Sequence, residues 1–246
     1  MKFTPSFLAA LLVLVAASAN AELPPLAADS AALDRAYIPA LMASGGKDLA
    51  KAQAAQKTYE TAWAIFAERQ RKAFPGNPEW TKVLAESDNA NVEASAALAN
   101  GKSADAHAAQ EIVRHALWHQ RQAMKVAYQP DLLTDFHATM ETIIATAQPK
   151  ATGTVSADHV ATLQSLLEKA RTQWASVKGA SWNPADYGIE GARLEGYRGA
   201  LAAEDHALDA LGAALADGKG PAIAQAANAL KPPFAKAYAA FGVFPQ

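Results

Sequence analysis

Apolar residues three and four positions apart recur along most of the chain. The strict alternation of apolar and polar residues that is typical of half-buried strands is scarce. Good helix formers, namely Ala, Leu, Gln, Lys and Glu, make up much of the sequence. The pattern therefore predicts an all-α protein with almost no strand content.

Start and stop signals divide this pattern into separate helices. Asn77-Pro78-Glu79 combines an N-cap residue, a proline at the first helical position and an acid in the first turn. Because proline lacks the backbone N–H, we expect Pro39 and the Pro232-Pro233 pair to kink or interrupt their helices. The signals predict helices over residues 30–43, 47–73, 79–99, 103–128, 131–147, 156–179, 189–216 and 221–240.

Three short similarities between the two halves occur in the same order. Residues 97–102 resemble 214–219, and Asn77-Pro78 resembles Asn183-Pro184. Residues 61–63 resemble 172–174. Duplication of a four-helix unit explains this order, and chance similarity of helix caps in an Ala-rich chain is the alternative. The predicted fold is an antiparallel helical bundle of two tandem four-helix units, residues 22–130 and 131–246, fused into about eight helices as two domains or one.

The first residues predict an export signal. A basic residue, Lys2, precedes an apolar run over residues 7–17, and Ala19-Asn20-Ala21 matches an A-x-A cleavage pattern before Glu22. This apolar run is shorter than a transmembrane helix, which needs about 20 residues to span a bilayer. We therefore expect residues 1–21 to be a cleaved signal peptide, with the mature protein periplasmic or secreted and without a transmembrane segment.

Charge and cysteine content exclude several classes of site. The formal charge of −2 and the lack of a basic block give no reason to expect nucleic acid as a partner. The chain has no cysteine. This rules out disulfides, iron–sulfur clusters and covalent haem attachment through cysteine. Any metal ion would be held by His, carboxylate or Met side chains.

The candidate chemistry lies on two predicted neighbouring helices. Glu111, His115 and His119 are four residues apart on the first, and His137 and Glu141 are four apart on the second. Residues four apart share a helix face, so such pairs can converge on one ion.

A short connection around Pro130 predicts that these two helices are antiparallel neighbours. His119 and Glu141 are equally far from Pro130, so they would lie level with each other. The predicted apolar stripe of the first helix consists of Ile112, Val113, Ala116, Ala123, Met124 and Ala127. His119 and His137 border the stripes of their helices, His115 and Glu141 lie further round, and Glu111 points toward solvent. All five side chains thus flank the seam between the helices. This position suits an accessible site for one copper, zinc or iron ion, and it suits solvated histidines equally.

We carry three functional hypotheses forward. The first is a periplasmic binding or carrier protein for a transition metal, with His115 and His119 as primary ligands completed by Glu141 or His137. The second is a non-enzymatic scaffold that binds a periplasmic protein, with the apolar tail over residues 241–245 as a candidate surface. The third is a small-molecule binder that uses a pocket between helices. No catalytic motif points to an enzyme, and the sequence does not specify the oligomeric state.

Overall fold

The protein is helical throughout the part of the chain that the computed structural model describes, residues 23–148 and 155–244. These residues form nine α-helices and one 3-10 turn, with no β-strand among them. The predicted all-α bundle is confirmed. The elements are α1 (Pro25–Ser44), α2 (Leu49–Ala73), α3 (Pro78–Ala99), α4 (Ser103–Ala123), α5 (Gln129–Ala147), α6 (Ala157–Gly179), η1 (Pro184–Tyr187), α7 (Gly191–Asp217), α8 (Gly220–Asn228) and α9 (Lys231–Ala239).

Several helix boundaries follow from local chemistry. The side chain of Asn77 caps α3, as predicted, by accepting from the backbone N–H groups of Glu79 and Trp80. The predicted last helix is two helices, because the Pro232-Pro233 pair begins α9 anew after α8 has ended. The helix predicted to reach residue 128 ends at Ala123, because Lys125 adopts a left-handed conformation with φ of 55°.

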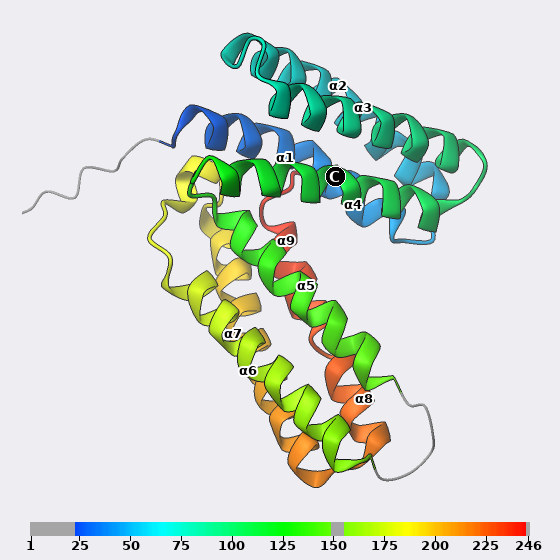
Figure 1. Ribbon diagram of the computed structural model, residues 1–246, viewed down its shortest axis with the longest axis vertical. Coiled ribbons are helices and arrows are strands. Elements are labelled where there is room, and N and C mark those ends of the chain that lie inside the picture. The colour runs from blue at the N-terminus through cyan, green and yellow to red at the C-terminus, as the bar shows by residue number, and fades with distance from the viewer. Residues whose placement is uncertain (1–22, 149–154, 245–246) are drawn as a thin grey trace, which may run out of the picture.

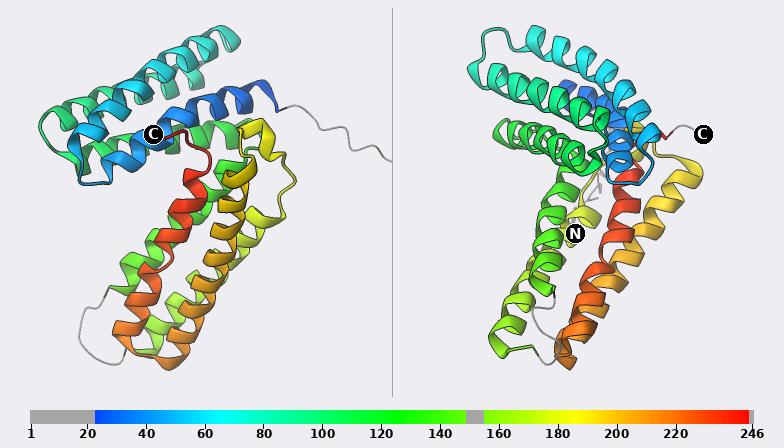
Figure 2. Two further views of the ribbon diagram at one scale, coloured as in Figure 1. Left: turned by 180° about the vertical axis from the view of Figure 1, so that it is seen from behind. Right: turned by 90° about the vertical axis from the view of Figure 1, so that its right-hand side faces the viewer.

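The helices form two groups that meet at an angle (Figures 1 and 2). Helices α1–α4 pack on one another, and α5–α9 form the second group. One continuous hydrophobic core runs through both, and a small Ala-rich cluster closes the far end of α2, α3 and α4. Trp63 of α2 and Trp174 of α6 are both buried in this core. The duplication itself stays a prediction, as does a domain boundary at residues 130–131.

The chain end at residues 241–244 folds back onto α1. Pro39 lies inside α1 and has no N–H to offer the carbonyl of Arg35 four residues earlier. The N–H of Val243 donates to that carbonyl instead, at 2.8 Å. Phe241 is buried among the rings of Trp182, Tyr187 and Tyr197. The apolar tail considered above as a partner surface is thus in part a structural contact, with Val243 and Phe244 still partly exposed.

Gly242 makes the tail contact possible. A Cβ atom there would lie 2.9 Å from Cδ of Pro39 and 3.1 Å from Cγ2 of Ile38. We expect Gly242→Ala to lower the free energy of unfolding by about 1–3 kcal/mol, because the clash displaces the tail. Thermal unfolding followed by circular dichroism measures this.

Gly196→Ala is the matched control. Gly196 lies within α7, and a Cβ atom there would meet nothing within 4 Å. Alanine should leave the unfolding temperature unchanged or raise it, since glycine is unfavourable inside a helix. Equal unfolding temperatures for Gly242→Ala and the unchanged protein would contradict the proposed tail contact.

None of the helices described here combines the length and the apolar character needed to cross a membrane. The predicted signal peptide, residues 1–21, lies outside the described residues.

Candidate functional site

Two buried arginines of α4 organise the region where the helix groups meet. Arg114 and Arg121 are seven residues apart, so they lie two turns apart on one face of the helix. Arg121 donates to both carboxylate oxygens of Asp131 at the start of α5, over 2.6–3.1 Å, and to Ser30 of α1 at 3.2 Å. Its guanidinium also lies 4.5 Å from the ring centroid of Tyr128. Arg121 therefore ties α4 to α1 and α5.

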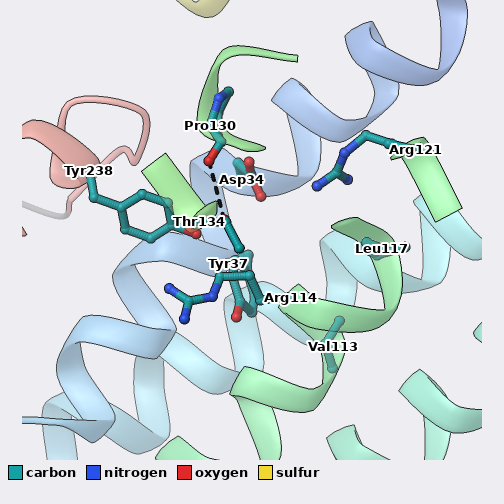
Figure 3. A pocket seen from close by; sticks show the side chains of 9 residues that line it. All are labelled: Asp34, Tyr37, Val113, Arg114, Leu117, Arg121, Pro130, Thr134 and Tyr238. Atoms are coloured by element: carbon teal, nitrogen blue, oxygen red, sulfur yellow. Dashed lines mark hydrogen bonds between the residues drawn. The ribbon is translucent and has the colours of Figure 1, made fainter. Parts of the chain in front are cut away.

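Asp34 of α1 completes this group, which we call the joint: Ser30, Asp34, Arg121, Tyr128 and Asp131. Tyr128 donates its hydroxyl to the Asp34 carboxylate at 2.6 Å. Loss of solvent raises the pKa of Asp34 from 3.8 to about 6, although Arg121 and the Tyr128 hydrogen bond oppose the shift. Asp34 lines a cavity of about 10 Å³, which has room for about one water molecule. Figure 3 shows the side chains that line this cavity.

The raised pKa of Asp34 predicts a pH effect on stability. The folded protein keeps this proton up to about pH 6, whereas the unfolded chain releases it near pH 3.8. The free energy of unfolding should therefore fall as pH rises from about 4 through 6. Asp34→Asn keeps an acceptor for Tyr128 and removes the titration, so it should gain about 3 kcal/mol over the unchanged protein at pH 7.5 and almost nothing at pH 4.

Urea unfolding of both proteins at several pH values measures this difference. Glu204, which is fully buried and has a pKa raised by burial to about 8, adds its own pH dependence to both proteins alike. The difference in stability between Asp34→Asn and the unchanged protein does not contain the contribution of Glu204. A stability difference that stays constant between pH 4 and 7.5 would contradict the role given to Asp34.

Beyond the joint, α4 and α5 diverge (Figures 1 and 2), and side chains of both helices line an open cleft at the inner corner of the molecule. Residues of α1 and α9 complete its walls, and its volume is about 760 Å³. We call this space the inner-corner cleft. Its polar lining consists of His107, Glu111, Arg114, His115, His137, Glu141 and Lys231, and its apolar lining includes Leu41, Met42, Phe234 and Tyr238.

Arg114 forms the buried base of the cleft. It pairs with Glu111 one turn earlier and donates to Nδ1 of His137 at 2.7 Å. Because a guanidinium only donates, Nδ1 of His137 accepts, and the ring proton of the neutral imidazole sits on Nε2. That atom lies 3.5 Å from Oε1 of Glu141. Both nitrogens of His137 are therefore directed at protein partners.

Glu111 lies between two other histidines. Its Oε1 is 3.7 Å from Nε2 of His107, and its Oε2 is 3.8 Å from Nε2 of His115. His107 is oriented by a 2.9 Å contact between Nδ1 and the carbonyl of Leu41. A carbonyl only accepts, so the proton of a neutral His107 ring sits on Nδ1 and its Nε2 lone pair faces Glu111.

The surroundings shift the pKa values of three groups in the cleft, His115, His137 and Glu141. Burial, followed by the charge of Arg114, lowers the pKa of His115. Burial likewise lowers the pKa of His137. The Glu141 carboxylate lies 2.8 Å from Nζ of Lys231, and His137 and Lys231 together hold its pKa at about 2.

The structure brings four of the five predicted site residues into this cleft. Glu111, His115, His137 and Glu141 all line it. His119 does not, because it lies in a separate groove between α3 and α4, with its ring centroid 4.4 Å from that of Trp118. Glu111 and His115 border that groove as well.

The expectation that the two helices are antiparallel neighbours is wrong. After the Arg121–Asp131 contact they separate, and Arg114, not His119, reaches His137. The predicted apolar stripe on the first helix is also displaced, since Ile112 is 40% exposed whereas Arg114 is 5% exposed. The stripe was assigned from hydropathy, which does not predict that an arginine faces inward.

The arrangement offers pairs of metal-binding groups. Within residues 23–148 and 155–244, no three His, Asp or Glu side chains are grouped so that they could hold one metal ion. The cleft instead contains the pairs His107–Glu111, His115–Glu111 and His137–Glu141.

Sequence reasoning missed several residues of the cleft. His107 could have been found, because His107 and Glu111 repeat the four-residue spacing of His137 and Glu141. Arg114 stands in a helix without any signal that it is buried. Lys231 and Tyr238 come from α9, about a hundred positions further along the chain than α4 and α5, and no spacing connects them.

Comparison with known proteins gave no match to a protein-family model, to a curated protein or to a solved structure.

Proposed function

We propose that this protein is a non-enzymatic binding protein whose inner-corner cleft takes a small organic molecule. The observation that carries the proposal is the cleft itself. Its volume of about 760 Å³ falls within the range of about 300–1,000 Å³ that is common for ligand pockets. Apolar side chains and a few convergent polar groups line it, as in such pockets.

The contacts inside the cleft favour binding over chemistry. Arg114, Glu111, His137, Glu141 and Lys231 are held in a chain of ion pairs and hydrogen bonds. Such a chain fixes the side chains in place and presents them to a ligand. The proposal also keeps the export predicted from residues 1–21, which would place the binding protein in the periplasm.

A fluorescent probe with an apolar body tests the cleft directly. Anilinonaphthalene sulfonate brightens when it leaves water for an apolar surface, so we expect it to bind the unchanged protein. Ala138→Trp should reduce this binding at least about tenfold, because Ala138 is an exposed residue that lines the cleft and an indole would fill part of the space.

Ala203→Trp is the control. Ala203 is exposed on α7 and lies away from the cleft, so this variant adds the same surface indole elsewhere. Probe binding that survives Ala138→Trp as well as it survives Ala203→Trp would reject the cleft as the binding site.

A transition metal ion is the second candidate ligand, and the His–Glu pairs favour it. An ion about 2.1 Å from each ligand atom fits the two pairs that Glu111 forms with His107 and His115, which are 3.7 and 3.8 Å apart. His107 and His115 flank the same carboxylate, so this part of the cleft is the place for copper, zinc or iron. Water would have to complete the coordination.

Metal titration by calorimetry distinguishes this candidate. If an ion is the ligand, about one Zn²⁺ or Cu²⁺ per chain should bind at pH 7.5, and binding should weaken below about pH 6 as imidazoles protonate. His107→Ala combined with His115→Ala should abolish it, whereas His119→Ala should not. Equal uptake by all these variants would remove metal binding in the cleft from consideration.

A further inference from the structure

Two ion pairs line the inner-corner cleft, and each consists of one acidic and one basic side chain. Glu111 is paired with the buried Arg114, and Glu141 is paired with Lys231 on α9. The pKa values of His115 and His137 are lowered, so near neutral pH these rings add no charge. The charges within the two pairs therefore cancel, and one acidic and one basic group remain available on different walls of the cleft.

The Glu111 side of the cleft is built to receive a donor. Arg114 pairs with Oε2 of Glu111, and Nε2 of His115 lies 3.8 Å from the same oxygen. Among the described residues, the group that faces Oε1 is Nε2 of His107, at 3.7 Å. In the neutral ring both atoms are acceptors, and no proton lies between them. An ammonium group has several N–H donors and fits between two acceptors at this separation, within about 2.9 Å of each.

The Lys231 side is built to receive an acceptor. Glu141 satisfies one of the three donors on the Lys231 ammonium, and the side chain is 60% exposed. Among the described residues, Glu141 is the one carboxylate that pairs with this ammonium group. A carboxylate can therefore bind Lys231 without breaking its contact with Glu141.

Apolar side chains from α1 and α9 line the cleft along with these two groups. Phe234 is stacked on the ring of His137, with centroids 5.0 Å apart, and Leu41 and Met42 line the wall that α1 provides. A ligand that spans the cleft therefore has apolar surface to cover.

From this arrangement we infer that the ligand is a zwitterion with an apolar body, whose ammonium group binds at Glu111 and His107 and whose carboxylate binds at Lys231. The inference rests on the proposed function, since it names the chemical class that the cleft takes. A singly charged molecule can use only one of the two charged walls.

Displacement of the anilinonaphthalene sulfonate probe at pH 8 compares four small molecules. Phenylalanine and 4-(aminomethyl)benzoate are zwitterions with short and long charge separation, and benzylamine and benzoate each carry one of the charges. We expect at least one zwitterion to displace the probe at about a tenfold lower concentration than benzylamine or benzoate does. Each singly charged molecule lacks one of the two charged groups and therefore loses the hydrogen bonds that this group makes.

Two variants assign the ends of the ligand. Lys231→Gln should weaken the zwitterion about tenfold and leave benzylamine unchanged. Lys236→Gln, which alters an exposed lysine of the same helix, should change neither. Glu111→Gln should weaken the zwitterion and benzylamine but not benzoate. Circular dichroism shows whether Glu111→Gln folds. If it does not, the comparison of Lys231→Gln with Lys236→Gln decides whether the ligand carboxylate binds at Lys231.

The outcomes separate this inference from the proposed function. The zwitterion inference is wrong if benzylamine or benzoate displaces the probe as well as both zwitterions do. It is also wrong if Lys231→Gln weakens the binding of benzylamine as much as it weakens the binding of the zwitterion. In either case the cleft remains a binding site. If probe binding does not depend on Ala138, the proposed function fails and the inference fails with it.

Discussion

The ion pair between Arg121 and Asp131 is the contact on which the arrangement of the molecule depends. It is 2.6 Å long, both side chains are almost fully buried, and it joins the last turn of α4 to the first turn of α5. Removing one partner of such a pair leaves an unpaired charge in the interior, which typically costs about 3–5 kcal/mol. Ser30, Tyr128 and Asp34 surround the pair, so the joint fixes α1 together with α4 and α5.

The cleft follows from this joint. With α4 and α5 held together at one end, they separate toward the other, and two turns along α4 Arg114 spans the gap to His137. Beyond Arg114 the helices no longer touch closely, and side chains that would be buried in a closed bundle line open space. Arg114 also sets the chemistry there, since it pairs with Glu111 and determines which nitrogen of His137 carries the proton. Architecture and electrostatics of the cleft thus come from two arginines on one helix face.

The sequence predicted the helices well because their limits are set by local chemistry. Asn77 caps α3 and the Pro232-Pro233 pair separates α8 from α9, and both effects need only neighbouring residues. The site was predicted in part, because spacing by four identifies Glu111, His115, His137 and Glu141 but not the direction in which each helix face points. Arg114 is buried together with the apolar residues Val113 and Leu117, and His119 lies in another groove, neither of which the spacing predicts. Contacts with Lys231 and Tyr238 depend on tertiary packing, which no local pattern encodes.

The joint sets the angle between the two helix groups, and a distance measurement tests this directly. The chain has no cysteine, so two can be introduced for spin labels, at Ala104 near the start of α4 and at Ala145 near the end of α5, both exposed. Pulsed electron spin resonance should give one narrow distance distribution in the otherwise unchanged protein. With Arg121→Met added, and helix content unchanged by circular dichroism, the distribution should broaden or shift. An unaltered narrow distribution in that folded variant would contradict the account.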